Sequence, residues 1–413
     1  MRGAIWVITL ATVAFPGELV AAAIAGAAYG DEGRAQEDND REDFQFAALY
    51  TADLWRNASG GLRTGSVYLD NLDLTLTVDG ESAWGLKGIS AFAYVLYNNA
   101  ARLSERLVGD AMTVSNIDAS AGLRLYEAWV QWTGGARRPV SLRFGLYDLN
   151  SEFDTSESRS LFIHSSHGVG HEFGQTGENG PSIFPVTSLG LRMAWNPARQ
   201  WRVQAVLLDG VPGERDHPDR SGIYLSAGEG MLGVAELQWS HARIRKLSLG
   251  YWSYTAHFND VRSADASPLP RRRGNAGVYS EIEIGLNDRG PDGAQGSAFV
   301  RYGVANGHIN EFDDSVSLGV RSRGLLRSRP EDEIGLAFSR AGVGPQVRDA
   351  AAMSGAPRDG YEAAIELTYR ATISEWLTIQ PDVQYILNPG ADPLLRDSVA
   401  IGVRFELSAA ALR

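Results

Sequence analysis

The chain has 413 residues, 44% of them hydrophobic, with no cysteine and a formal net charge of −12. The lack of cysteine excludes thiol nucleophiles, disulfides and cysteine-based metal sites, and the acidic balance argues against nucleic acid as a partner. Only Lys87 and Lys246 are lysines, so arginine carries nearly all of the positive charge. Its planar guanidinium is suited to fixed, directional hydrogen bonding.

The N-terminus has the pattern of an export signal. Arg2 precedes an apolar core (Ala4 to Phe15), which is followed by small residues that offer cleavage sites. We expect residues 1–28 to be removed; a membrane anchor is the less favoured alternative, because the core is short for a span. Residues 29–43 are strongly acidic and are predicted to form a mobile, solvated segment. Residues 44–413 are expected to form one domain.

From residue 44 onward, apolar and polar residues alternate with the period of two that is typical of β-strands. In the clearest case, Ile365 and Leu367 share one face of a segment and Glu366 and Thr368 share the other. Most of the alternating segments run about nine to eleven residues, the length of a tilted transmembrane strand. Sixteen segments are predicted, centred on Phe46, Leu74, Phe92, Ala128, Phe144, Leu191, Ala205, Ala235, Tyr251, Ile282, Val300, Leu318, Leu336, Leu367, Val383 and Val403.

Two of these segments look longer than a bilayer requires. They run from Arg63 to Asp79 and from Lys246 to Phe258, and we expect both to project beyond the membrane.

The connections between the segments alternate in length. Short ones span residues 79–85, 133–139, 196–200, 241–245 and 374–376, and long ones span 98–122, 148–187, 210–230, 259–275 and 341–360. This alternation around an even strand count is typical of outer-membrane barrels, with short periplasmic turns and long extracellular loops. Sixteen strands enclose a lumen too wide for side chains to fill, so the apolar rows should face lipid. The sequence therefore predicts an all-β, closed antiparallel transmembrane barrel of about sixteen strands in the bacterial outer membrane.

Several sequence blocks resemble the carbohydrate-selective porin family of the OprB type. They are Ser115–Ala119, Arg124–Gln131, Leu142–Asp148, Phe153–Ser156, Leu161–Ser166 and Gln380–Gly390. The resemblance spans nearly the whole chain after the N-terminal segment and keeps its order. It implies passive diffusion of monosaccharides such as glucose into the periplasm, without a cofactor. It also implies two extracellular loops that fold inward, a barrel that works alone rather than as a trimer, and outer-membrane lipid and lipopolysaccharide as surroundings.

A channel for neutral, polyhydroxylated solutes needs hydrogen-bonding groups in its wall and flat apolar surfaces. Alternation predicts that the inward row supplies both kinds of group. Its candidate pore-lining residues are Glu127, Trp129, Gln131, Arg143, Arg192, Arg202, Glu236, Arg301, Glu366, Arg370 and Gln384. Glu127 and Arg143 are the strongest candidates, because they flank the long loop that begins at Asp148. The alternative for each polar residue is a solvated position without a role in selection. Trp129 and Trp252 also face inward, where each could either stack on a sugar or brace an inward loop.

Other motifs are weaker. His164, His167 and His171 beside Glu172 have metal-like spacing, but no metal site is expected, because a mobile loop would not fix their geometry. Residues 271–273 are three arginines that should form a solvated tip, with contact to anionic lipopolysaccharide as the alternative. A hydrolase is disfavoured because no G-x-S-x-G setting occurs. A general or structural outer-membrane barrel remains the main alternative.

Overall fold

The structure is a computed structural model. It describes residues 43–99, 101–135, 137, 139–215, 217, 220, 222–226, 228–263, 270–288 and 295–409. The expected export signal and all of the acidic segment except Asp43 lie outside the described residues.

Sixteen strands form one closed antiparallel barrel, in which each strand pairs with the next along the barrel and the last closes on the first. They are β1 (Phe44–Ser59), β2 (Gly65–Asp79), β3 (Ile89–Asn98), β4 (Gly122–Gly134), β5 (Val140–Tyr147), β6 (Ser188–Ala198), β7 (Trp201–Asp209), β8 (Met231–His241), β9 (Ile244–Tyr254), β12 (Ala276–Asp288), β13 (Gln295–Ala305), β14 (Phe312–Arg323), β15 (Glu333–Val343), β16 (Tyr361–Ser374), β17 (Leu377–Leu387) and β18 (Ser398–Ala409). Each predicted segment centre lies in one of these strands, in the predicted order. The predicted fold class is confirmed.

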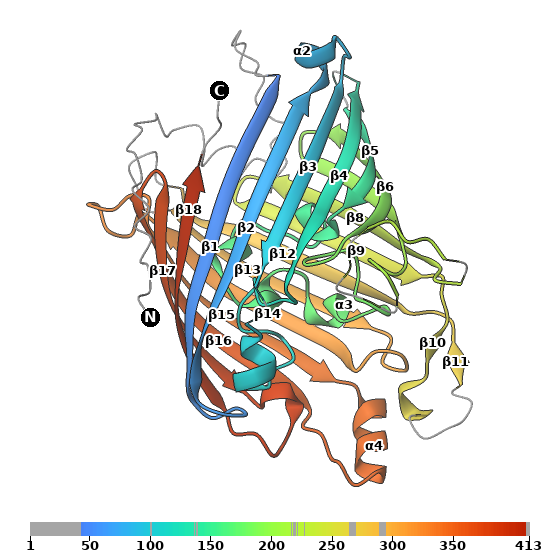
Figure 1. Cartoon of the computed structure of the whole chain (residues 1–413), viewed down its shortest axis with the longest axis vertical. Coiled ribbons are helices and arrows are strands. Elements are labelled where there is room, and N and C mark those ends of the chain that lie inside the picture. The colour runs from blue at the N-terminus through green and yellow to red at the C-terminus, as the bar shows by residue number, and fades with distance from the viewer. Residues whose placement is uncertain are drawn as a thin grey trace, which may run out of the picture.

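The expected long strand from Lys246 to Phe258 is wrong. Strand β9 ends at Tyr254, because β12 begins only at Ala276 and no neighbour continues the ladder further. Phe258 belongs instead to β10 (Phe258–Asn259), which pairs with β11 (Arg271–Arg272) in a separate hairpin. Figure 1 shows this hairpin beyond the end of the barrel wall.

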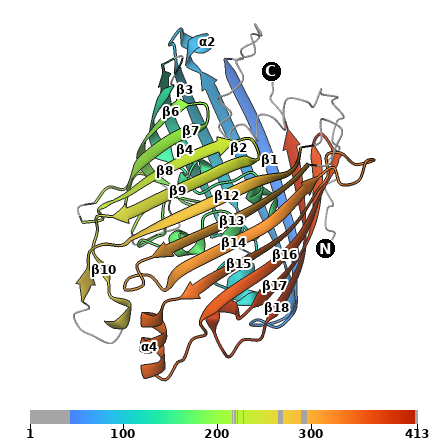
Figure 2. The same cartoon turned by 180° about the vertical axis from the view of Figure 1, so that it is seen from behind.

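The remaining elements are short helices. They are α2 (Gly80–Trp84), α3 (His171–Gly174), α4 (Pro345–Met353), a π-helical turn η2 (Ser104–Val108) and the 3-10 turns η3 (Leu149–Ser151), η4 (Arg159–Leu161), η5 (Ser165–His167), η6 (Val261–Ser263) and η7 (Pro389–Ala391). In the described part of the chain, no helix has the length and apolar character needed to cross a membrane. The turn helix α2 lies at one end of the barrel, whereas α4 and the β10–β11 hairpin lie at the other (Figures 1 and 2).

The barrel wall has the predicted two faces. Ile365 and Leu367 of β16 are exposed on the outer surface, while Glu366 and Thr368 are buried on the inner side. In β4, a bulge opposite Tyr94 and Val95 inserts Tyr126 as an extra residue. The bulge reverses the alternation, because an inserted residue shifts every later side chain to the other face.

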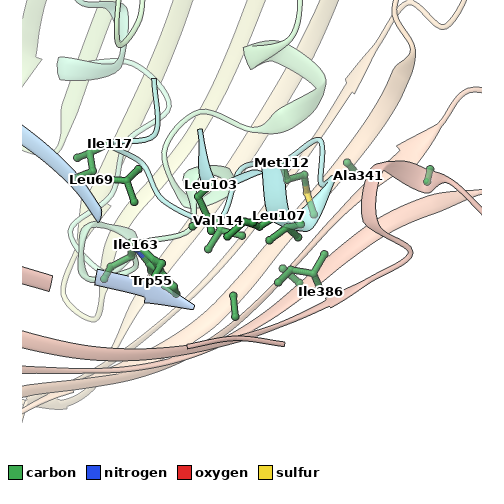
Figure 3. Packing of buried hydrophobic residues seen from close by; sticks show 14 of the residues in the cluster. Trp55, Leu69, Leu103, Leu107, Met112, Val114, Ile117, Ile163, Ala341 and Ile386 are labelled. Carbon is green, nitrogen blue, oxygen red and sulfur yellow. The ribbon is translucent and has the colours of Figure 1, made fainter. Parts of the chain in front are cut away.

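Two loops fill much of the lumen, which side chains from the wall alone would leave open. The first inner loop (residues 99–121) contributes Leu103, Leu107 and Val114 to an apolar cluster with Trp55 and Leu69 of the wall (Figure 3). Burial of this apolar surface favours the inward position of the loop.

The second inner loop (residues 148–187) builds a separate cluster. Phe153 and Phe173 pack there against Trp252 and Tyr279, and the rings of Phe173 and Trp252 stack at 4.8 Å. Trp252 therefore braces the loop, as the alternative interpretation of this residue proposed.

Candidate functional site

A buried network of charges fastens the second inner loop to the wall. We call it the charge latch; its members are Asp154, Arg159 and Glu172 of the loop, Glu281 of β12 and Arg301 of β13. Arg301 donates to Asp154 at 2.8 Å and to Glu172 at 2.7 Å, and Arg159 donates to Glu281 at 3.0 Å. Their side chains are at most 1% exposed. Charges buried this deeply persist only where partners and hydrogen bonds replace water.

The latch also sets the ionisation of its loop members. Burial alone would raise the pKa of Asp154, but the guanidiniums of Arg301 and Arg159 outweigh it and hold that pKa below its ordinary value. The amide of Gly170 donates a further hydrogen bond of 3.0 Å to Asp154. Asp154 therefore stays anionic and ties two parts of the loop to one arginine of the wall.

The tip of the second inner loop reaches the far side of the barrel. The carboxylate of Glu366 in β16 accepts hydrogen bonds from the amides of Ile163 at 2.6 Å and His164 at 3.2 Å. Gln380 of β17 donates to the carbonyl of Leu161 at 2.8 Å. The loop leaves β5, so these contacts show that it crosses the lumen.

The first inner loop is held by the same stretch of wall. Glu362 of β16 accepts hydrogen bonds from the amides of Ala111 at 2.8 Å and Met112 at 2.7 Å. Gln384 of β17 donates to the carbonyl of Val114 at 3.0 Å. These bonds satisfy backbone amide and carbonyl groups of the loop, which have no partner in the strand pairing of the barrel.

The two inner loops also bind each other. The amide of Asn116 donates to the carbonyl of Ile163 at 2.9 Å, and the amide of Ser165 donates to the carbonyl of Thr113 at 3.1 Å. The loops therefore form one plug-like insert, which narrows the lumen as the resemblance implied.

A second cluster of charges remains partly open to water. We call it the arginine cluster; it consists of Arg143, Arg192 and Arg202, on three neighbouring strands, around Glu152 of the second inner loop. Glu152 lies 2.8 Å from Arg192, 2.9 Å from Arg202 and 3.4 Å from Arg143. The side chains of Arg143 and Arg202 are 12% and 20% exposed, whereas that of Arg192 is 2% exposed.

Burial would raise the pKa of Glu152, but Arg143, Arg192 and Arg202 together lower it to about 2. Glu152 is therefore anionic at neutral pH. One carboxylate faces three guanidiniums in this cluster, which leaves an excess of positive charge at an accessible part of the inner wall.

Trp129 and Gln131 of β4 orient Arg143. Gln131 accepts hydrogen bonds from Arg143 at 3.0 Å and from Arg192 at 2.8 Å. The guanidinium of Arg143 lies 3.7 Å from the ring centre of Trp129, and Phe92 of β3 stacks on the same ring at 5.1 Å. Because β3 and β5 flank β4, these two neighbours cover the tryptophan from either side. Trp129 thus supports Arg143 rather than offering an open surface to a solute.

The eleven residues predicted to line the pore all lie on the inner face, but the loops divide them. Trp129, Gln131, Arg143, Arg192 and Arg202 come together around Glu152, and the Glu127 carboxylate accepts a hydrogen bond from the Trp129 indole at 3.2 Å. The loops bury four others almost completely: Glu236, Arg301, Glu366 and Gln384. Arg370 stands apart and pairs with Glu406 at 2.6 Å.

The predicted list did not include the loop partners of these residues. Asp154, Arg159 and Glu172 follow no periodic pattern, so alternation could not assign them. The sequence feature that could have indicated them is the high density of charged residues in the loop of residues 148–187, which also contains blocks that resemble the OprB family.

The rings of His164 and His167 lie 6.0 Å apart, but the three loop histidines have different partners. His164 contacts the hydroxyl of Ser166 at 2.7 Å, His167 contacts that of Ser317 at 2.8 Å, and His171 packs against a phenylalanine ring. No three His, Asp or Glu side chains among the described residues are placed to hold a metal ion.

The expectation that the loop around these histidines is mobile is not met, because its histidines are packed and buried. Burial lowers the pKa of His164 to about 3 and that of His171 to about 4, and it lowers the pKa of His167 well below its ordinary value. All three side chains are therefore neutral at pH 7.

A closed barrel of sixteen strands with an insert of two loops and a partly open charged cluster defines the porin class of outer-membrane channels. The chain belongs to the carbohydrate-selective porin, OprB family, whose sequence model matches residues 63–408. It is therefore a channel protein of the bacterial outer membrane, and carbohydrates are the solutes of its family.

Known proteins of similar sequence and fold agree. Porin B of Pseudomonas aeruginosa is 25% identical over 91% of this chain and 90% of its own length. The putative porin QuiX of Acinetobacter baylyi is 21% identical over 92% of each chain. The high-pH structure of Pseudomonas putida OprB has a TM-score of 0.77 at 19% identity and covers 89% of this chain and 94% of its own.

Proposed function

We propose that this porin lets monosaccharides such as glucose diffuse passively into the periplasm, and that the arginine cluster contacts them where the inner loops narrow the lumen. The observation that carries the proposal is the availability of fixed donors. Nη2 of Arg143 and Nη1 of Arg202 have no hydrogen-bond partner among the described residues, while other atoms of both guanidiniums are held.

Fixed donors suit a neutral sugar, because its hydroxyl oxygens accept hydrogen bonds and charged donors form the stronger ones. The oxygens of Glu152 and Gln131 accept hydrogen bonds from the same guanidiniums, which fixes the donors in position. Only a few donor atoms are free to contact the solute. Weak binding is required of a channel, because a solute that binds tightly does not leave.

The test is glucose block of the single-channel current in planar bilayers. Arg143→Ala should weaken the block about tenfold, since one charged hydrogen bond contributes roughly 1.5–3 kcal/mol. It should also shift ion selectivity toward cations, because a fixed positive charge is lost from the wall. Arg143→Lys should retain the ion selectivity but not the full block, because lysine lacks the planar fork.

The matched control is Arg348→Ala, which removes one positive charge from the exposed surface of α4 at the end of the barrel (Figure 1). It should leave both readouts at wild-type values. Equal glucose block in wild type and Arg143→Ala would contradict the proposed role of the cluster. Absence of block in the wild type, for glucose and other monosaccharides alike, would contradict the proposed solute.

We also propose that residues 1–28 are an export signal and that one barrel suffices for function. Both follow from the sequence pattern and from a constriction built by a single chain. Sequencing the N-terminus of the mature protein and measuring its mass in detergent by light scattering test the two points. A retained N-terminus or a trimeric mass would contradict them.

A further inference from the structure

A recess lies at the loop end of the barrel wall, between β2 and the first inner loop. It has a volume of about 280 Å³ and is lined by Arg63, Ser66, Tyr68, Arg106 and Leu107, among others. Ser66 and Tyr68 are exposed on the outer face of β2, so the recess opens on the side that meets lipid.

The recess exists because β2 extends further than the neighbouring strand β3 at this end of the barrel. Pairing between β2 and β3 stops at Asn71 and Asn98. Asn99 still donates to the carbonyls of Asp70 at 3.2 Å and Tyr68 at 3.4 Å, and the chain then turns away from the wall. The first inner loop returns only at Leu107, whose carbonyl accepts a hydrogen bond of 3.0 Å from the amide of Arg63. The outer end of β2 is therefore left with an open flank between these two contacts.

Four arginines without acidic partners lie in or near this recess, and two of them, Arg63 and Arg106, line it. We call Arg56, Arg63, Arg106 and Arg396 the arginine rim. Nε of Arg63 donates to the carbonyl of Arg106 at 3.1 Å, and the carbonyl of Arg396 accepts from the amide of Gly61 at 2.9 Å. Arg56 lies opposite Ser66 in the ladder between β1 and β2. All four are exposed, and within the described part of the chain none of them forms an ion pair.

The nearest carboxylates have partners of their own. Asp70 accepts a hydrogen bond of 2.9 Å from Tyr50, and Asp397 accepts one of 2.7 Å from Tyr385. Glu105 pairs with Arg102 at 3.1 Å. The concentration of positive charge at the rim stands out, because the whole chain carries a net charge of −12.

Beside and below the rim, the outer face of the wall is largely apolar. Leu54, Tyr68 and Ile401 are exposed there on three adjacent strands, and Asp70 on the same face accepts a hydrogen bond of 2.9 Å from Tyr50. A row of arginines above an apolar wall, at the extracellular end of the barrel, matches the layering of the outer leaflet, where headgroups lie above acyl chains.

We propose that the arginine rim binds a lipid of the outer leaflet whose headgroup carries phosphate, as lipopolysaccharide does. The phosphate lies between Arg63 and Arg106, and an acyl chain runs along Leu54 and Tyr68. Guanidinium forks match phosphate oxygens in geometry and charge, and an adjacent low-dielectric medium strengthens the attraction. This inference does not depend on the sugar pathway.

The arginines at residues 271–273 lack this setting. Arg271 and Arg273 are exposed on and beside the β10–β11 hairpin, where both contact His257, and Arg272 pairs with Asp260. The hairpin projects beyond the wall (Figure 2), so no lipid-facing surface adjoins it. It therefore supplies a control with equal loss of charge.

The experiment uses the purified full barrel in detergent and measures bound lipid by native mass spectrometry. The probes are lipid A with both phosphates, lipid A from which the phosphates have been removed, and inorganic phosphate alone. For the first probe, Arg63→Ala/Arg106→Ala should bind at least tenfold more weakly than the wild type, a change of about 1.4 kcal/mol. Arg271→Ala/Arg273→Ala should bind as the wild type does, and glucose block should be unchanged in both variants.

Three results would overturn the proposal: equal affinity of wild type and rim variant for phosphorylated lipid A, an equal loss in the control variant, or unchanged binding of wild type to the dephosphorylated lipid. Saturable binding of inorganic phosphate at the rim with no binding of lipid A would assign the site to free anions instead. A rim-dependent shift to dimer mass without lipid would assign it to a second copy of the chain.

Discussion

Replacing Asp154 with asparagine tests whether the charge latch holds the second inner loop in place. Asp154 has a left-handed backbone with φ of 52°, which asparagine tolerates well, so the substitution introduces no new strain. The carboxylate accepts hydrogen bonds from Arg301 at 2.8 and 3.0 Å and from Arg159 at 3.0 Å. Asparagine keeps the shape and removes the charge.

The expected cost follows from what remains. Removing one partner of a buried ion pair costs about 3–5 kcal/mol, because the other charge stays buried. In Asp154→Asn, Arg301 keeps Glu172 and Arg159 keeps Glu281, so we expect the lower end, about 3 kcal/mol. The loss should fall on the docking of the loop, because the barrel ladder does not contain Asp154.

Hydrogen exchange measures this local opening directly. Amides of residues 155–170 should exchange roughly 100-fold faster in Asp154→Asn, since each 1.36 kcal/mol is about tenfold. Glu178→Gln is the matched control: it lies in the same loop and pairs with Arg215 at 2.5 Å, but both side chains are well exposed, so little change is expected. If the amides of residues 155–170 exchanged at the same rate in Asp154→Asn as in the wild type, the charge latch would not be what holds the loop in place.

Three further predictions concern the wall, the loop histidines and the fit of the loop. Leu367→Arg should lower the stability of the barrel folded in vesicles by about 2–4 kcal/mol if the site lies near the midplane of the bilayer, whereas Leu367→Phe should not. A denaturant titration of both variants measures the difference. Because the folded pKa values of His164 and His171 are about 3 and 4, the undocked loop binds more protons below pH 6.5. Docking should therefore weaken from pH 6.5 to 4.5, by up to about 2.7 kcal/mol per histidine. Glutamine at both positions should reduce this pH dependence and leave only the part that comes from His167, whose pKa burial also lowers. Gly303→Ala should loosen the loop and raise conductance, because its added Cβ would collide with the carboxylate of Glu172.

The strands could be predicted from sequence because their signal is local. Alternation and a bilayer-sized length identify each strand without knowledge of its partners. The bulge in β4 shows the limit of this reasoning. Glu127, Trp129 and Gln131 lie on one side of it and were correctly placed on one face, whereas Arg124, three residues before Glu127, also faces inward and was missed.

The filling of the lumen could not be predicted in detail. Glu172 and Arg301 are 129 residues apart in the chain and meet only because the loop folds across the barrel. The same burial applies to Thr368, which alternation placed on the polar inner face of the barrel. In the structure it is 1% exposed and accepts a hydrogen bond of 2.8 Å from Gln380. A position on the inner face is therefore not necessarily a position on the channel.

The two means of fastening the insert have different effects. Apolar clusters stabilise its burial but tolerate sliding, since the hydrophobic effect has no direction. A buried ion pair adds little net stability over well-packed apolar residues, because desolvation offsets the attraction, but its geometry is specific. Asp154 lies only two residues from Glu152, a distance of at most about 7 Å along the chain. The latch that holds Asp154 therefore also holds Glu152 among its arginines, and a slip of one residue would turn Glu152 away from them. It follows that Asp154→Asn should alter glucose block as well as loop exchange, although Asp154 itself is buried and cannot touch the solute.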